Sequence, residues 1–117
     1  MQLQDWTPEE IMQKVAKGKQ FTLLLLRPVA PLPNDPEKIN QLQMGNLAHL
    51  FRMEEEGKSS LYGPVINNQM LNGIIVFNTI NKEDIHQWTS DDPHIKAGYL
   101  TYDLYDWFTL PGQKIPE

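Results

Sequence analysis

Residues 21–27, FTLLLLR, form a short segment that is apolar at almost every position. Successive side chains of a strand point to opposite faces, so Phe21 lies on one face while Leu24 and Leu26 lie on the other. A strand that is apolar on both faces has to be covered on both sides. Residues 74–80 show the same pattern. The chain therefore needs a fold in which both faces of a sheet are buried.

Three helices are predicted from the residues that precede them. The side chains of Thr7, Asp35 and Asn81 can each accept hydrogen bonds from the free N–H groups of a first helical turn. Glu10 follows Thr7 at the spacing of a capping box. These signals predict helices over residues 8–17, 36–56 and 82–91.

The first predicted helix is short and is expected to lie on the surface of the main fold. The second helix offers a surface for it, a second apolar flank formed by Met44, Leu47 and Phe51. Because residues three and four apart share one side of a helix, these three side chains are neighbours. We expect the first helix to cover this flank.

The order of elements indicates the fold class. Strands are predicted over residues 21–27, 59–65, 74–80 and 98–108, which gives the order β-α-β-β-α-β after an N-terminal helical extension of residues 1–19. This is the ferredoxin-like arrangement, an α+β fold whose helices cover one face of the sheet. The other apolar face then needs a cover, and a second copy of the same sheet is the simplest one. The sequence thus predicts a homodimer.

Charge and residue content exclude several classes of function. The net charge is −5, and no basic cluster is present that could neutralise nucleic-acid phosphates. The longest apolar run, residues 23–26, is far below the roughly 20 residues needed to cross a membrane. The absence of cysteine, together with the lack of an apolar leader in the first twenty residues, favours a cytoplasmic protein.

Asn46 and His49 are the unusual residues of the second predicted helix. Asn46 lies in the middle of its apolar stripe, where an unsatisfied amide would cost about 1–3 kcal/mol. It is therefore expected either to face a polar pocket or to make a structural hydrogen bond. His49 lies at the edge of the same stripe. It is either a hydrogen-bonded histidine of the fold or a catalytic base.

The segment TSDDPHIKAGYL, residues 89–100, allows three interpretations. Asp92 precedes Pro93, which disfavours the α conformation, so Asp92 is expected to end the preceding helix. Alternatively, Asp92 is a functional carboxylate of a pocket. A metal site formed by Asp91, Asp92 and His94 would lack further ligands, so neither a metal nor another cofactor is predicted. Arg27 is expected to form a surface ion pair or to bind an anionic ligand.

Four segments in this order resemble the YciI-like (YCII-related) family. They are FTLLLLRP, NLAHLFRMEEEGK leading into SSLYGPV, NGIIVFNT, and DDPHIKAGYLTYDLYDWF. The resemblance covers about residues 20–108 and implies a domain over residues 20–117. It also implies a dimeric α+β barrel with a cleft between sheet and helices.

Members of this family are proposed to use a helical histidine and the aspartate of an Asp-Pro pair as an acid–base dyad. At the matching positions this chain has Asn46 and Asp92. An asparagine cannot exchange protons near neutral pH. His49 or His94 would have to replace the missing histidine, or the dyad is lost. The resemblance also places Gly63 and Pro64 in the ligand cleft.

Two functions remain open. One is a small enzyme that carries out proton transfer, isomerisation or elimination on a small organic molecule with an altered dyad. The other is a non-catalytic homodimer that binds a small ligand or a partner in the same cleft.

Overall fold

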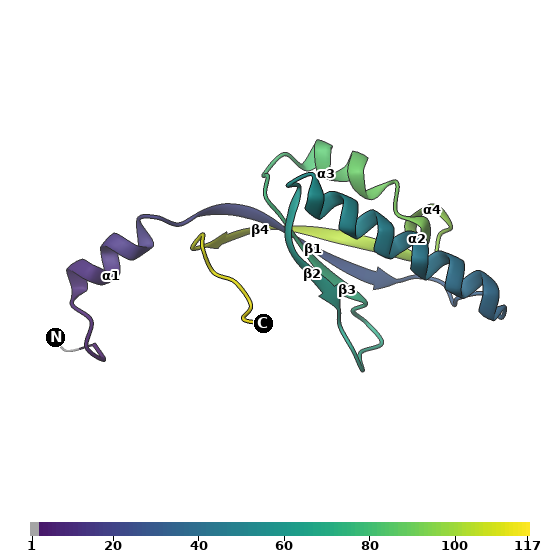
Figure 1. Ribbon diagram of the computed structural model, residues 1–117, viewed down its shortest axis with the longest axis horizontal. Coiled ribbons are helices and arrows are strands. Elements are labelled where there is room, and N and C mark those ends of the chain that lie inside the picture. The colour runs from purple at the N-terminus through teal and green to yellow at the C-terminus, as the bar shows by residue number, and fades with distance from the viewer. Residues whose placement is uncertain (1–2) are drawn as a thin grey trace.

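The computed structural model describes residues 3–117. Its elements are α1 (Pro8–Val15), β1 (Lys19–Pro28), α2 (Pro36–Glu55), β2 (Ser59–Pro64), β3 (Gly73–Phe77), α3 (Lys82–Thr89), α4 (Pro93–Lys96) and β4 (Leu100–Thr109). The predicted β-α-β-β-α-β order is confirmed, with α1 in front of it and the short α4 inserted before β4 (Figure 1).

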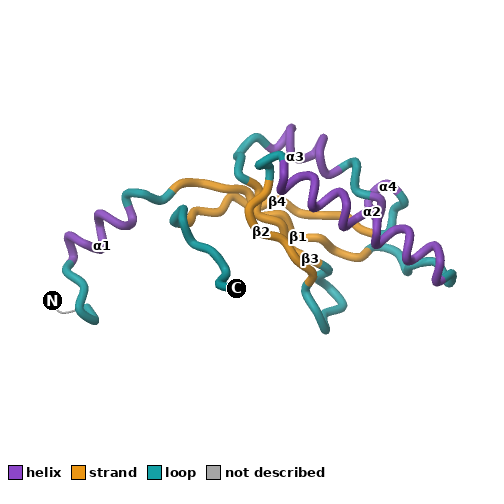
Figure 2. Tube along the Cα trace, in the orientation of Figure 1, coloured by secondary structure: helices purple, strands orange, loops and turns teal. Residues whose placement is uncertain are grey.

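The four strands form one antiparallel sheet in the order β2-β3-β1-β4. Helices α2, α3 and α4 lie together on one side of the sheet (Figure 2). The predicted α+β, ferredoxin-like fold class is therefore confirmed. Strand β3 ends at Phe77, three residues earlier than predicted. The chain turns away at Asn78, whose side-chain amide donates to the backbone carbonyl of Gly57 at 3.0 Å.

The core lies between the helices and the sheet. It contains the alternate side chains of β1 and their neighbours, which are Leu24, Leu26, Leu50, Met53, Ile75, Phe77, Ile85 and Leu100. Leu24, Phe77 and Ile85 are completely buried. Burying a large aliphatic or aromatic side chain contributes about 1.5–3 kcal/mol, so this cluster is a main source of stability.

The opposite side of the sheet, which we call the open face, carries the remaining apolar side chains of the strands. Cross-strand pairing places Leu23 beside Val76 and Tyr105, and Leu25 beside Ile74. Leu23 and Leu25 are half-buried and Tyr105 is exposed. Within residues 3–117 the C-terminal segment 110–114 lies against part of this face only. The prediction that the second face needs further cover is thus consistent with the fold.

Helix α1 begins as predicted but does not lie where it was expected. The backbone N–H of Glu10 donates to Thr7 Oγ1 at 3.2 Å, and that of Thr7 donates to Glu10 Oε1 at 2.9 Å. The predicted contact with the flank of α2 is wrong. Figure 1 places α1 at the far end of the molecule, and Met44, Leu47 and Phe51 remain exposed.

The pairing of β1 with β4 explains the position of α1. The ladder continues to the pair Lys19–Thr109, beyond the point where β3 stops pairing with β1 at Thr22. This two-stranded ribbon carries α1 away from the helices, and the molecule extends to 60 Å along its longest axis. Long-range strand pairing therefore overrides the local preference of an amphipathic helix for a nearby surface.

Asp92 has a different structural role from the one predicted. The helix from Lys82 already ends at Thr89, and Asp92 caps the next helix, α4, instead of ending α3. Its backbone is extended, as expected before proline.

Among residues 3–117, no helix has both the length and the hydropathy needed to cross a membrane.

Candidate functional site

Asn46 and Asp92 are joined by a direct hydrogen bond. Asn46 Nδ2 donates to Asp92 Oδ2 at 2.7 Å, and the backbone N–H of His94 donates to Asp92 Oδ1 at 2.8 Å. The Asp92 side chain is 2% exposed. Both carboxylate oxygens thus have a donor, as a buried charged group requires. The two residues that the sequence singled out lie together.

A glycine allows α2 and α4 to approach closely enough for this bond. A Cβ atom on Gly45 would lie 2.9 Å from Cγ of Pro93, which is too close for a real contact. No role was predicted for Gly45 from the sequence, although a glycine inside a long helix is a signal of close approach. It therefore belongs to the structure that supports the Asn46–Asp92 pair.

A cleft of about 320 Å³ lies between α2 and strands β2 and β3, and we call it the helix-side cleft. Its walls are mostly apolar. They are formed by Leu26, Gln43, Asn46, Leu47, Leu50, Tyr62, Gly63, Pro64, Asn72, Gly73, Ile74 and Ile75. Asn46, Gly63 and Pro64, which were predicted to bind a ligand, are among these walls. Asp92 is not, and contacts the wall through Asn46.

The bond to Asp92 also fixes the orientation of the Asn46 amide. A carboxylate only accepts hydrogen bonds, so Nδ2 has to face Asp92 and not the carbonyl oxygen. Oδ1 is then the acceptor that Asn46 can offer to the cleft. A ligand bound beside Asn46 can therefore donate an O–H or N–H group to Oδ1, or accept from the second hydrogen of Nδ2.

Tyr62 lies at the rim of the helix-side cleft. Its hydroxyl donates to the carboxylate of Glu54, and this bond raises the pKa of Tyr62 to about 12. The Phe51 ring is 6.4 Å from the Tyr62 ring, centroid to centroid. Tyr62 therefore stays protonated near neutral pH and is a polar wall of the cleft more than an acid–base group.

Neither candidate histidine has its imidazole ring hydrogen-bonded to Asp92. His49 is buried at the side of α2, and burial lowers its pKa despite the opposing effect of the Asp92 carboxylate. His94 Nδ1 lies 3.8 Å from Asp92 Oδ1, which is beyond hydrogen-bond distance. This nitrogen is buried and has no hydrogen-bond partner among residues 3–117. The geometry of a ready acid–base dyad is thus incomplete.

The lowered pKa of His49 predicts a specific pH dependence of stability. In the folded chain His49 binds fewer protons than in the unfolded chain, whose histidine pKa is about 6.5. The free energy of unfolding should therefore fall as the pH drops below about 6.5. We expect His49→Gln to make urea-unfolding curves less dependent on pH between about pH 5 and 7.

The control for this measurement is Gln41→Ala, at an exposed position of α2 without a titratable group. It should keep the pH dependence of the wild-type chain. If His49→Gln and Gln41→Ala show the same slope, His49 is not the group responsible.

Arg27 lies outside the helix-side cleft. Its Nε donates to Asp103 Oδ2 at 2.5 Å, and Nη2 donates to Oδ1 at 3.2 Å. This pairing lowers the pKa of Asp103. Of the two predictions for Arg27, the geometry agrees with the surface ion pair.

Residues 3–117 contain no group of three acidic or histidine side chains arranged to hold a metal ion.

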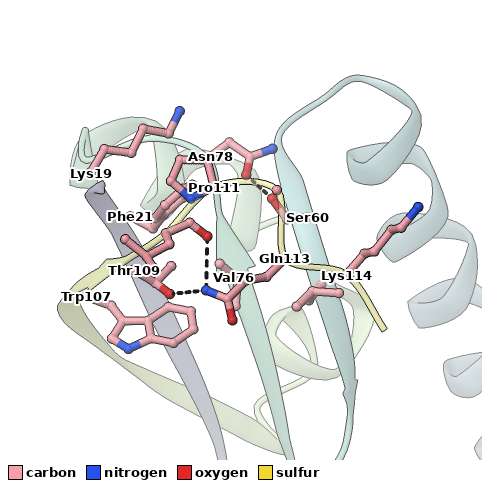
Figure 3. A pocket seen from close by; sticks show the side chains of 13 residues that line it. Lys19, Phe21, Ser60, Val76, Asn78, Trp107, Thr109, Pro111, Gln113 and Lys114 are labelled. Atoms are coloured by element: carbon pink, nitrogen blue, oxygen red, sulfur yellow. Dashed lines mark hydrogen bonds between the residues drawn. The ribbon is translucent and has the colours of Figure 1, made fainter. Parts of the chain in front are cut away.

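A second cavity, of about 380 Å³, lies on the open face (Figure 3). Phe21 and Trp107 come from the sheet, and the C-terminal segment 110–114 closes the other side. Gln113 Nε2 donates to Thr109 Oγ1 and to the carbonyl of Leu110, which holds this segment in place. The cavity is on the opposite side of the sheet from Asn46 and Asp92. It belongs to the surface that a second copy is expected to cover.

The sequence matches no protein-family model, and no curated protein matches it significantly. Several solved structures are similar to it, and two of them are enzymes. One is the 5-chloro-2-hydroxyhydroquinone dehydrochlorinase TftG from Burkholderia phenoliruptrix AC1100, in complex with 2,5-dihydroxybenzoquinone. It has a TM-score of 0.57 and 17% identity, over 74% of this chain and 92% of its own. The other is a muconolactone isomerase, with a TM-score of 0.61 and 16% identity, over 83% and 97% of the two chains.

The chain shares with these two structures its α+β fold, a four-stranded antiparallel sheet with helices on one side. At these identities the similarity is one of fold. Different families share such a fold while differing in chemistry, so the finer resemblance to the YciI-like family stays a prediction.

Proposed function

We propose that this chain is a YciI-like homodimer that binds a small, mainly apolar organic molecule in the helix-side cleft. The observation that carries the proposal is the Asn46 amide, held by Asp92 at 2.7 Å on the wall of that cleft. Such a fixed acceptor recognises a ligand by its O–H or N–H group. The apolar walls then provide most of the contact area.

The character of the walls supports a neutral ligand. The polar side chains of the cleft are Gln43, Asn46, Tyr62 and Asn72, and none of its wall residues is charged. A volume of about 320 Å³ is at the lower end of small-molecule pockets, which measure roughly 300–1,000 Å³. The complex of TftG with 2,5-dihydroxybenzoquinone supports a ring compound with hydroxyl groups as the first class to test.

Asn46→Leu tests this proposal. Neutral hydroxylated ring compounds are screened by thermal shift, and the affinity of the best compound is then measured by calorimetry. Loss of the acceptor should raise the Kd at least tenfold, or about 1.4 kcal/mol. Gln41→Leu, at an exposed position of α2, should leave the Kd unchanged. Equal affinity of the Asn46→Leu and wild-type chains would contradict the role of the amide.

A second candidate is an acid–base enzyme, and His94 favours it. Its buried Nδ1, without a hydrogen-bond partner among residues 3–117, is only 3.8 Å from Asp92 Oδ1. A shift of about 1 Å would bring the two groups to the distance at which protons are exchanged. The isomerase and the dehydrochlorinase with this fold add support for chemistry on a small molecule.

Asn46→His tests whether this site can hold a titrating dyad. Position 46 reaches the carboxylate, so the new imidazole should have its pKa raised by Asp92 unless burial outweighs the charge. NMR titration of Asn46→His is compared with that of Asn46→His combined with Asp92→Asn. An unchanged pKa of the new histidine after removal of the carboxylate would exclude the dyad.

A further inference from the structure

The apolar side of α1 has little to pack against in its own chain. Trp6, Met12 and Val15 are exposed, and α1 contains no buried residue. Among residues 3–117, Leu110, which follows β4, lines an apolar hollow together with this side of α1. An isolated helix of eight residues is marginal in water, even with a good cap. Helix α1 therefore needs a surface to be stable.

A suitable apolar surface lies on α2. Met44, Leu47 and Phe51 are exposed on one side of that helix, which we call the α2 flank. The flank is on the side of the edge strand β2, because Phe51 contacts Tyr62 of that strand. It also adjoins the helix-side cleft, since Leu47 is one of the cleft walls. Several large exposed apolar side chains in one patch are typical of an interaction site.

The topology separates these two surfaces within one chain but brings them together between two chains. Strand β4 is one edge of the sheet and β2 is the other. If two open faces stack with the two-fold axis parallel to the strands, β4 of one copy lies beside β2 of the other. The segment that contains α1 and precedes β1, which we call the arm, then leaves the β1–β4 ribbon next to the partner's β2. The arm leaves at the end of the sheet where β2 begins, which is also where the C-terminal end of α2 lies.

The charges at that end are complementary. Lys14 and Lys17 lie at the C-terminal end of α1, and α2 ends in the acidic run of residues 54–56. Basic groups brought to the C-terminal end of a helix also interact favourably with its dipole. The apolar side of the arm thus matches the α2 flank, and its two lysines match the acidic C-terminal end of α2.

We infer that α1 of each copy packs on the α2 flank of the other copy, so that the homodimer exchanges its N-terminal arms. The inference rests on the proposed homodimer. In this assembly the partner's arm borders the helix-side cleft at Leu47. The site is then complete only in the dimer, and the apolar sides of both α1 and α2 are covered.

Cross-linking between two different chains tests this exchange, and the absence of native cysteine makes the experiment simple. A tagged Met12→Cys chain and an untagged Met44→Cys chain are refolded together and treated with a short bis-maleimide. The tagged Met12→Cys chain paired with Met70→Cys is the control, since Met70 is highly exposed but lies in the loop before β3. We expect at least fivefold more cross-linked heterodimer with Met44→Cys than with Met70→Cys.

Light scattering of the same samples distinguishes a failure of the arm exchange from a failure of the homodimer. A dimer with equal cross-linking to both positions would overturn the arm exchange and leave the homodimer in place. A monomer at the concentration used would overturn both. A dimer with selective cross-linking to Met44→Cys would support the exchange.

Discussion

Replacing Asp92 with alanine is expected to lower the free energy of unfolding by about 3 kcal/mol, because a buried hydrogen-bonded carboxylate and a helix cap are lost together. Its side chain is 2% exposed and accepts hydrogen bonds from Asn46 and from the backbone N–H of His94. The substitution would leave the amide of Asn46 without its partner. Urea unfolding followed by circular dichroism measures the change.

Asp91 provides the matched control, one residue earlier in the chain. Its side chain is 71% exposed and lies 3.9 Å from Lys96. Asp91→Ala should change the free energy of unfolding by less than about 0.5 kcal/mol. A double-mutant cycle of Asp92→Ala with Asn46→Ala should give a coupling of about 1–2 kcal/mol. Equal effects of Asp91→Ala and Asp92→Ala would show that the pair does not stabilise the fold.

Replacing Leu23 with glutamate is expected to dissociate the proposed homodimer. Leu23 lies in the middle of the open face, between Val76 and Tyr105, and is half-buried in the single chain. A carboxylate at this position would be buried without a partner when two open faces stack, which is unfavourable. The dissociation constant should rise at least 100-fold, or about 2.8 kcal/mol. Analytical ultracentrifugation over a range of concentrations measures it.

Gln41→Glu adds the same charge to an exposed position of α2, on the other side of the sheet, and should leave the dissociation constant unchanged. Thermal unfolding of the Leu23→Glu chain checks that each copy still folds. If this variant dimerises as tightly as the wild-type chain, the open face is not the interface.

The strands and helix starts could be predicted because their signals are local. The alternation of apolar residues predicted that Leu24 and Leu26 share one face of a strand that needs cover, and both are buried in β1. The caps at Asp35 and Asn81 likewise start helices at the predicted positions. In each case the deciding atoms lie within a few residues of one another, so the sequence pattern contains the necessary information.

The position of α1 and the burial of His49 depend on contacts that are distant in sequence. No local signal shows that β1 continues its ladder to Thr109 and takes α1 away from α2. His49 was placed at the edge of a stripe by helical periodicity, which does not indicate how far neighbouring elements cover that edge. The family resemblance, more than any spacing, indicated that Asn46 and Asp92 share a site, and their hydrogen bond agrees with it.

The pairing of β1 with β4 has a consequence for the order in which the chain folds during synthesis. Lys19 pairs with Thr109, so a central strand made early waits for a partner that is made much later. Contacts between such distant segments slow folding. Until β4 arrives, β1 has an unpaired edge and two apolar sides, which promotes aggregation. The nascent chain is therefore most vulnerable in the interval between the synthesis of β1 and that of β4.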